Sequence, residues 1–416
     1  MSEIEAAPLA TLASLITDKV TVNKDPLKPY VGLEHIPSNG SVLLDFGSGG
    51  GSISTNNVFK IGDILFGKLR PGLRKSVRVN FEGYCSTDIL VLRPNDPNDA
   101  TFVSFVLRSD PVFMQAVRTE EGTKMPRCSW KSIKDLSVFC PRFLQQRRIA
   151  EILSTVDEAI EQTEALIAKY QQVKAGLMHD LFIRGVTPDG HLRPTRAQAP
   201  HLYKESVLGW IPKEWEVVRI ADAFEIQLGK MLNKFAKTGK LSAPYLGNRA
   251  VQWDFVDISA IEVMDFNAYE RQKFSLLPGD LLVCEGGDVG RTAMWRGEMD
   301  ECYYQKAIHR LRPKSADALP AFMLRFMRFA RDSGYFREFT SQSSIAHLTQ
   351  EKLGSIGMLS PSLDEQKRIA DRLDSLDGFI QMEQSKLAKL RQQKQGLMQD
   401  LLTGRVRVKV AESASV

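Results

Sequence analysis

The chain has 416 residues, of which 43% are hydrophobic and 25% charged, and a formal net charge of +5 at pH 7. This composition is typical of a globular protein of two or three domains, and the mild positive charge permits a nucleic-acid partner without requiring one. No apolar run approaches the roughly 18 residues that a membrane span needs, the N-terminus lacks a secretory signal, and the five cysteines form no CxxC pair. We therefore expect a cytoplasmic protein without a metal site.

Residues 1–145 are predicted to form a first mixed, β-rich domain. The segments GDILFGKLR (62–70) and STDILVLRP (86–94) are short apolar runs bounded by turn residues, which is typical of strands. The segment TFVSFVLRSDPVFMQAV (101–117) is predicted to be helical.

The same domain contains a window without acidic residues, between Asp63 and Glu82. It holds five cations, which are Lys68, Arg70, Arg74, Lys75 and Arg78. Phosphates attract such clusters through counterion release, and arginine can also bind a purine edge through two hydrogen bonds. We predict DNA contacts here, and a solvated surface face is the alternative.

A long helix is predicted over 146–184. Its apolar residues recur at alternating spacings of four and three, as in the heptad seam of a coiled coil, beginning with Ile149, Leu153, Val156 and Ile160. Thr163 and Lys174 interrupt this seam, and polar residues in a seam lower stability but disfavour slipped registers. A helix of 36 residues is about 54 Å long at 1.5 Å per residue, so we expect a spacer.

Residues 185–210 are rich in proline, glycine and polar residues and are predicted to be a linker. Residues 211–362 are predicted to form a second domain on the plan of the first. YVGLEHI (30–36) corresponds to YLGNRAV (245–251), and the two strand segments correspond to GDLLVCEGG (279–287) and QKAIHRLRP (305–313). PAFMLRFMRFARDSGYF (320–336) is predicted to be the matching helix.

The second domain also has an acid-free window, between Glu225 and Asp254. It contains Lys230, Lys234, Lys237, Lys240 and Arg249, with Asn248 and Gln252 close by. Asparagine and glutamine can also bind purine edges, so we predict a second DNA contact surface. Lys306, Arg310 and Arg312 form a weaker third cluster on a predicted strand.

A second long helix is predicted over 363–405. Residues 366–401 align with 146–181 without a gap, and 16 of the 36 pairs are identical. The seam begins with Ile369, Leu373, Leu376 and Ile380, and it is interrupted by Glu383 and Lys394, at the same two places as in the first copy. The fold class is therefore predicted to be α+β, a tandem duplication of a mixed, β-rich domain followed by a long helix.

No catalytic centre is predicted. GDILFGKL resembles a P-loop, but Leu69 replaces the hydroxyl residue that would bind magnesium, and DILF suits a buried strand. FGSGGGSIS (46–54) lacks the third glycine of a dinucleotide fingerprint and is predicted to be a flexible loop. The chain has no consecutive prolines, and hence no Asp/Asn-Pro-Pro-aromatic motif of an amino-methyltransferase.

Nearly the whole chain resembles the specificity subunit of type I restriction-modification systems. The likeness rests on GDILFGKLRP with CSTDILVLRP, on LGWIPKEWEVVRI, on PYLGNRAVQW with GDLLVCEGGDVGRTAMW, and on LSPSLDEQKRIADRLDSLD with KQGLMQDLLTGRV. The resemblance implies a non-catalytic subunit whose two target recognition domains, 1–145 and 211–362, read the halves of an asymmetric, bipartite DNA site. It also implies that the two long helices pair as an antiparallel coiled coil.

The resemblance further implies the partners. These would be double-stranded DNA, two modification subunits that bind S-adenosylmethionine and methylate adenine, and restriction subunits that use ATP and magnesium. No cofactor is expected in this chain. A specificity subunit of a modification-only system, a fused enzyme and a coiled-coil scaffold without a DNA role are the alternatives.

Overall fold

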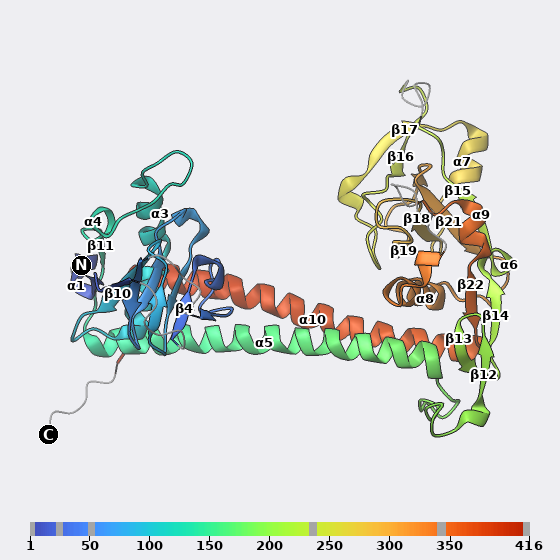
Figure 1. Cartoon of the computed structure of the whole chain (residues 1–416). Coiled ribbons are helices and arrows are strands. Elements are labelled where there is room, and N and C mark those ends of the chain that lie inside the picture. The colour runs from blue at the N-terminus through green and yellow to red at the C-terminus, as the bar shows by residue number, and fades with distance from the viewer. Residues whose placement is uncertain (1–4, 22–27, 49–54, 233–238, 339–346, 411–416) are drawn as a thin grey trace. The chain divides into compact units, whose positions relative to one another are not determined.

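The computed structural model describes residues 5–21, 28–48, 55–232, 239–338 and 347–410. The chain divides into two compact units (Figure 1). Unit 1 comprises residues 1–166 and 383–416, and unit 2 comprises residues 167–382. Each unit therefore contains one globular domain together with part of each of the two long helices, α5 (Phe143–Arg184) and α10 (Leu363–Leu401).

The globular domain of unit 1 is built from short strands and short helices. The described strands are β1 (Ala6–Pro8), β2 (Ala13–Ile16), β3 (Lys19–Thr21), β4 (Pro29–Val31), β5 (Gly47–Ser48), β6 (Thr55–Phe59), β7 (Ile64–Gly67), β8 (Ser76–Arg78), β9 (Gly83–Cys85), β10 (Ile89–Pro94) and β11 (Ser137–Phe139). The described α-helices are α1 (Leu9–Leu12), α2 (Ala100–Leu107), α3 (Asp110–Arg118) and α4 (Trp130–Ile133). Asp99 caps α2, because its side chain accepts a hydrogen bond from the Phe102 amide at 2.8 Å.

The globular domain of unit 2 has the same composition of elements. The described strands are β12 (Tyr203–Ser206), β13 (Gly209–Pro212), β14 (Glu216–Arg219), β15 (Phe224–Leu228), β16 (Ser242–Leu246), β17 (Glu262–Asp265), β18 (Leu281–Cys284), β19 (Thr292–Met294), β20 (Tyr303–Tyr304), β21 (Ile308–Pro313) and β22 (Gly357–Ser360). The described α-helices are α6 (Ile220–Ala223), α7 (Ala268–Phe274), α8 (Pro320–Asp332) and α9 (Gln350–Ser355).

The two domains share the topology of their four-stranded sheet, whereas the second sheet has five described strands in unit 1 and three in unit 2. A four-stranded sheet has the order β2-β10-β7-β8 in unit 1 and β15-β21-β18-β19 in unit 2. A parallel pair joins β4 to β9 with Tyr30 opposite Tyr84, and another joins β16 to β20 with Tyr245 opposite Tyr303. The matched sequence segments thus occupy matched strands, and the predicted α+β duplication is confirmed.

Alternate residues of the central strands face two different cores. In β10, Leu90 and Leu92 pack in one buried cluster, whereas Ile89 and Val91 pack in another. In β18, Leu281 and Val283 face one cluster while Leu282 and Cys284 face a second. A strand that is buried on both faces needs a continuous apolar run, which explains segments such as ILVL and LLVC.

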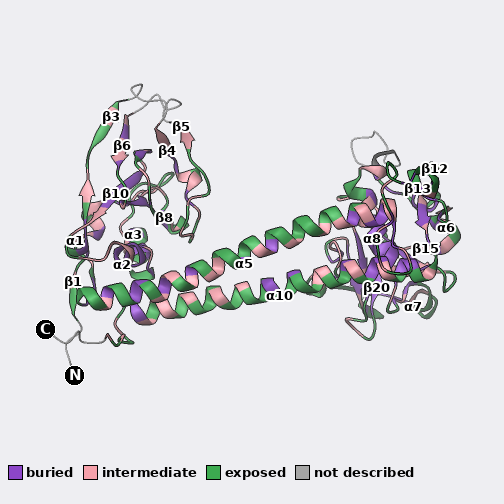
Figure 2. Ribbon diagram, turned by 90° about the horizontal axis from the view of Figure 1, so that it is seen from below, coloured by how far each residue is buried: buried purple, intermediate pink, exposed green. Residues whose placement is uncertain are grey.

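Parts of α5 and α10 pack together in each unit. The first turns of α5 and the last turns of α10 belong to unit 1, and the reverse holds in unit 2, so the helices form the predicted antiparallel pair. Figure 2 shows buried positions where the helices meet each domain and largely exposed outward faces. Of the predicted seam residues, Ile149, Leu153, Ile369, Leu373 and Ile380 are buried, and Val156, Ile160 and Leu376 are partly buried.

A buried glutamine joins each long helix to its domain. The Gln146 side-chain oxygen accepts a hydrogen bond from the Asp99 amide at 2.9 Å, next to α2. Gln366, at the same repeat position, accepts one from the Leu319 amide at 3.0 Å, next to α8. Because both glutamines are almost fully buried, each domain is held firmly to the start of the helix that follows it.

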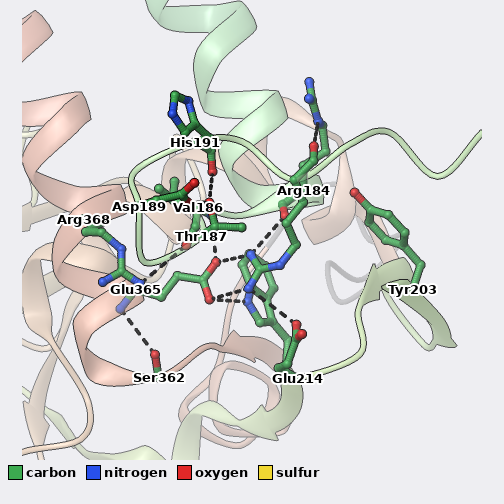
Figure 3. Close-up of polar contacts among 12 residues, drawn as sticks. Arg184, Val186, Thr187, Asp189, His191, Tyr203, Glu214, Ser362, Glu365 and Arg368 are labelled. Atoms are coloured by element: carbon green, nitrogen blue, oxygen red, sulfur yellow. Dashed lines mark hydrogen bonds and ion pairs between the residues drawn. The ribbon is translucent and has the colours of Figure 1, made fainter. Parts of the chain in front are cut away.

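The segment 185–210, which we predicted to be a linker, is ordered and ends in the β12–β13 hairpin. It packs on Glu365 near the start of α10 (Figure 3). The Glu365 carboxylate accepts hydrogen bonds from the Val186 amide at 2.7 Å, from both terminal nitrogens of Arg193 at 2.5 and 3.1 Å, and from Trp215 Nε1 at 3.0 Å. This buried, fully hydrogen-bonded carboxylate attaches the segment to α10.

The P-loop-like segment is a strand. Residues Ile64–Gly67 form β7 and are all buried, as the sequence predicted, so they cannot wrap a phosphate. Of the glycine-rich segment 46–54, residues 49–54 lie outside the described residues. None of the described helices has the length and hydropathy needed to cross a membrane.

Candidate nucleic-acid interface and its helical support

The basic window of unit 1 lies on the connection between β7 and β8. A short 3₁₀ turn, Pro71–Leu73, carries Arg70 before it and Arg74 after it. Both arginines have positive φ, 49° for Arg70 and 53° for Arg74. Left-handed backbone is uncommon for non-glycine residues and often marks a position held for function.

The five cations of this window differ in burial and in the hydrogen bonds and ion pairs that their side chains make. Arg74 pairs with Asp110, Lys75 Nζ donates to the Leu33 carbonyl at 2.6 Å, and Arg78 donates to Thr101 Oγ1 at 2.9 Å. Lys68 is partly buried. Arg70 is exposed, and among the described residues its side chain has no hydrogen-bond or ion-pair partner, so it is the best placed of the five to meet a ligand.

Only part of the basic window of unit 2 lies among the described residues and is available to a ligand. Lys234 and Lys237 lie outside the described residues. Lys230 is partly buried and pairs with Glu270 at 2.6 Å, while also donating to the Asp265 carbonyl at 2.6 Å. Lys230 therefore holds the fold together, and the other described residues of the window are Lys240, which is exposed, and Asn248, Arg249 and Gln252.

Asn248, Arg249 and Gln252 lie on the loop after β16. Arg249 is exposed, and its carbonyl accepts a hydrogen bond from Gln252 Nε2 at 2.7 Å. Asn248 donates to the Gly286 carbonyl at 3.3 Å, and its Oδ1 is buried without a hydrogen-bond partner among the described residues. Arg249 resembles Arg70 in being an exposed arginine whose side chain has no hydrogen bond or ion pair among the described residues.

Two of the three cations of the weaker third cluster serve the fold, whereas Lys306 is exposed. Arg310 is buried and pairs with Glu225 at 2.9 Å, and Arg312 pairs with Asp280 at 2.6 Å. Arg93 and Asp63 make the matching pair in unit 1 at 2.7 Å. The repeated Gly-Asp and Leu-Arg-Pro phrases therefore mark a structural ion pair between the two central strands of each sheet.

One cationic group was missed by the sequence analysis. Trp253, which follows Arg249 and Gln252 on the same loop, has the guanidinium groups of Arg328 and Arg331 at 5.1 and 5.6 Å from its ring. Trp253 Nε1 donates to Asp288 at 2.6 Å. Arg328 and Arg331 lie on the predicted helix and pair with acids, Arg328 with Asp332 at 2.9 Å and Arg331 with Asp288 at 3.2 Å, so they add little net positive charge to the surface beside Trp253.

The two lysines that interrupt the helix seam each pair with an aspartate of the other long helix. In unit 1, Lys394 Nζ lies 2.5 Å from Asp157 Oδ1. In unit 2, Lys174 Nζ lies 2.5 Å from Asp377 Oδ1. The lysines are 220 residues apart, and so are the aspartates, so the pairing is reciprocal. This reciprocity gives a physical reason for the matching interruptions.

An arginine from the adjacent domain completes each pair. Arg108, at the C-terminal end of α2, lies 3.4 Å from Asp157 Oδ2. Arg325, on α8, lies 2.7 Å from Asp377 Oδ2. We call Arg108, Asp157 and Lys394 the unit 1 charge triad, and Arg325, Asp377 and Lys174 the unit 2 charge triad. Each triad connects a domain to both long helices.

The two arginines differ in how far nearby carboxylates offset the effect of burial on the pKa. Burial is the largest influence on the pKa of Arg108, which is lowered despite the nearby Asp157. Burial also opposes the charge of Arg325, but hydrogen bonding to Asp374 and the charges of Asp254 and Asp377 raise its pKa overall. Burial likewise lowers the pKa of Lys394, and Arg108 adds to that effect. The cations of unit 1 are therefore less fully compensated than those of unit 2.

The described residues contain no group of three His, Cys, Asp or Glu side chains placed to hold a metal ion. The five cysteines form no disulfide, and burial raises the pKa of the Cys85, Cys284 and Cys302 thiols to about 12, about 11 and about 12. These thiols are buried and uncharged, as expected for structural cysteines.

Comparison with known proteins identifies the family. The model described as "Type I restriction modification DNA specificity domain" matches residues 22–171 and again residues 212–392. The chain belongs to this family. The two matches coincide with the two halves of the duplication, so each half is one copy of the specificity domain with most of its long helix.

Curated relatives carry names of the same kind. The chain is 26% identical over 361 residues to the type I restriction enzyme MjaVIII specificity subunit of Methanocaldococcus jannaschii, covering 84% of this chain and 77% of that protein. It is 24% identical over 368 residues to the putative MjaX specificity subunit of the same organism, covering 84% and 79%. The likeness thus extends through both domains and helices.

Solved structures share the fold. One chain, from a study titled as the structural basis of complex assembly and conformational transition of the type I R-M system, has a TM-score of 0.61 at 19% identity, covering 96% of this chain and 98% of that chain. The S subunit of the type I restriction-modification system of M. genitalium has a TM-score of 0.57 at 16% identity, covering 95% of each chain. At such identities the likeness speaks for the fold alone.

Proposed function

We propose that this protein is the DNA specificity subunit of a type I restriction-modification enzyme, and that its two target recognition domains read the two halves of an asymmetric, bipartite site. The observation that carries the proposal is the family match in two copies, each on a domain whose basic window presents one exposed arginine without a side-chain hydrogen bond or ion pair among the described residues. Arg70 would serve one half-site and Arg249 the other.

The divergence of the two windows supports an asymmetric target. The strands and helices of the two domains correspond, but the windows differ: one surrounds a 3₁₀ turn and the other has Asn248, Arg249, Gln252 and Trp253 on a loop. Direct reading of base edges depends on which donors and acceptors a surface presents. Two surfaces that present different groups would select different base sequences.

The partners follow from the same proposal. The long helices and the domains would bind two modification subunits, which would supply S-adenosylmethionine and methylate adenine. Restriction subunits would add the ATP- and magnesium-dependent cleavage. This chain would itself contribute no catalysis, and the complex would act in the cytoplasm, where its DNA substrate lies.

Selection from a random DNA library tests the proposal. The chain is assembled with its modification subunits, and bound duplexes are recovered at several salt concentrations, because phosphate contacts alone give strongly salt-dependent binding without sequence preference. We expect recovered sequences to share two defined blocks that differ from each other and are separated by a constant gap. Equal recovery of all sequences at every salt concentration would contradict the proposal.

A further inference from the structure

A cavity of about 910 Å³ lies within unit 1, beside the unit 1 charge triad. Its walls are the loop Pro37–Leu44, the N-terminal end of α3, and the facing parts of α5 and α10. All three triad residues line it, together with apolar side chains such as Leu43, Ile160 and Met398. The cavity therefore combines buried charge with apolar surface.

Arg108 is incompletely satisfied at this cavity. One terminal nitrogen contacts Asp157 at 3.4 Å. Its Nε and its other terminal nitrogen are buried and have no hydrogen-bond partner among the residues that the structure describes. The side chain is 11% exposed. A buried guanidinium with two unpartnered donors is costly, because the desolvation of those groups is not compensated.

The other half of the molecule shows what satisfies such an arginine. In unit 2, Arg325 contacts three carboxylates: Asp377 at 2.7 Å, Asp374 at 2.5 Å and Asp254 at 3.0 Å. Arg325 lies about one helical turn closer to the first residue of α8, Pro320, than Arg108 lies to the first residue of α2, Ala100. The two guanidinium groups nevertheless reach aspartates at the same repeat position, so the two sites are comparable.

Unit 1 lacks two of these three carboxylates. The repeat position of Asp374 is occupied by Ser154, 220 residues earlier. Asp254 lies nine residues after Tyr245, and Asn39 lies nine residues after the matching Tyr30. Asn39 and Asp254 also share a left-handed backbone, with φ of 57° and 71°. Asn39 lines the cavity, so a neutral amide stands where unit 2 has an acid.

The charge balance differs by one carboxylate. The acids near Arg108 and Lys394 are Asp157 and Glu161, and the negative charge of Glu161 favours the charged form of both cations. The other charged residues of the cavity wall are paired with each other, Arg391 with Glu164 and Arg74 with Asp110. In unit 2, Arg325 and Lys174 are accompanied by three acids. One added carboxylate would give unit 1 the same balance, whereas a doubly charged phosphate would exceed it.

We propose that this cavity binds the side-chain carboxylate of an aspartate or glutamate that a protein partner presents between apolar residues. The carboxylate accepts a hydrogen bond from one of the two unpartnered nitrogens of Arg108. The apolar neighbours lie against the rim, where Val42 and Leu44 are 55% and 70% exposed. The inference goes beyond the proposed function, because it assigns a cavity and the chemical group that the cavity binds, and it holds whether or not the domains read DNA.

Binding of a short peptide to the full-length chain tests this site. The probe is acetyl-Leu-Asp-Leu-amide, and acetyl-Leu-Asn-Leu-amide, of nearly the same shape, is the neutral control. We expect calorimetric titration to show that the aspartate peptide binds at least about tenfold more tightly, as a charge-assisted hydrogen bond to a buried arginine would provide. Equal affinity for the two peptides would overturn the proposal, and so would displacement of the aspartate peptide by inorganic phosphate at the peptide's own concentration.

Two substitutions at one position locate the binding. N39D supplies a carboxylate from within the chain, as Asp254 does in unit 2, and should lower the affinity for the aspartate peptide at least about tenfold. N39G keeps the left-handed backbone but adds no charge, and should bind as the unmodified chain does. R108M should abolish binding, but the N39D and N39G pair decides the question even if R108M fails to fold. Unchanged binding in N39D would place the peptide elsewhere and refute the inference.

Discussion

Arg70 and Arg249 are the arginines of the two basic windows that are exposed and whose side chains have no hydrogen bond or ion pair among the described residues, and each belongs to a different compact unit. We expect R70A to remove base preference from one block of the DNA site and R249A to remove it from the other, each with a loss of about 1–3 kcal/mol in discrimination. Library selection with each variant complex measures both blocks at once.

Matched exposed arginines outside the windows serve as controls for that experiment. Arg142 in unit 1 and Arg296 in unit 2 are exposed, and their replacement by alanine should leave both blocks unchanged. If R70A or R249A weakened both blocks equally, the arginine would serve general phosphate attraction or folding, and not the reading of one half-site.

His309 predicts a pH dependence of stability in unit 2. Burial lowers its pKa from the ordinary 6.5, and Nε2 lies 2.8 Å from the Leu348 carbonyl. The unfolded chain therefore takes up a proton near pH 6.5 while the folded chain does not, so stability is complete above that value and falls as the pH drops through the lowered pKa. The loss is at most about 1.4 kcal/mol per pH unit.

Urea unfolding of unit 2 at about pH 7.5 and about pH 5.5 measures this loss. H309Q keeps a donor toward the Leu348 carbonyl without a titrating ring, so the difference between the two pH values should shrink. H179Q, at an exposed position, should leave it unchanged. An undiminished difference in H309Q would assign the pH dependence to other groups.

At the scale of elements, the proposed function gives the two long helices the role of a spacer between the two domains. Insertion of seven residues after Leu166 and seven after Met382 preserves the heptad and lengthens each helix by about 10.5 Å. Under the proposed function, the gap between the two DNA blocks should grow by about three base pairs at 3.4 Å each, with both blocks unchanged. Library selection reads the gap directly.

A seven-residue insertion into α5 alone is the control. It brings the two helices out of step, so the reciprocal pairs of Lys174 with Asp377 and Lys394 with Asp157 can no longer both form. We expect this variant to lose stability instead of gaining a longer gap. A gap that stayed constant after the double insertion would contradict the spacer role.

The sequence anticipated the elements better than it anticipated their contacts. The repeat, the seam and the matched strand phrases predicted the duplication, because periodicity and apolar runs depend on local pattern. Lys174 and Lys394 were predicted to disfavour slipped registers, but their aspartate partners depend on the relative register of two distant helices. The same limitation hid Arg108 and Arg325, which lie in predicted domain helices and carry no local sign of a partner.

The candidate site was predicted only in outline. A count of charges in a window could not distinguish Arg70 from Lys75, because only the fold shows that Lys75 donates to a buried carbonyl. Arg310 and Arg312 looked like a basic cluster but pair with acids brought from other strands. The contact of Trp253 with Arg328 and Arg331 required the tertiary structure.

At the scale of the whole molecule, each unit has its own buried cores and its own charge triad. We therefore expect D157N to lower the thermal stability of unit 1 and D377N that of unit 2. D157N removes the carboxylate that pairs with both Arg108 and Lys394, at a cost of about 3 kcal/mol, which is several degrees in melting temperature for a unit of this size. D377N unpairs Lys174, but Arg325 keeps Asp374 and Asp254, so we expect a smaller shift. Calorimetry should resolve two transitions, of which each variant moves one.

Exposed acids provide the controls for these two variants. E158Q in unit 1 and D371N in unit 2 change one exposed charge on the same helices and should shift neither transition by more than about 0.5 kcal/mol. If D157N and D377N lowered a single shared transition, the two units would unfold together, and the triads would act on the whole chain.

The turn from the first long helix into the second domain tolerates almost no added volume. Gly185 follows α5 with φ of +67°, and a methyl group on its α-carbon would lie 2.3 to 2.5 Å from Glu365 Oε1, an Arg193 nitrogen and the Trp215 ring. Even alanine here would displace the Glu365 carboxylate from its hydrogen-bond donors, which are the Val186 amide, Arg193 and Trp215. The absence of a side chain at Gly185 thus leaves the space in which Glu365 of α10 stays hydrogen-bonded to the segment that follows α5.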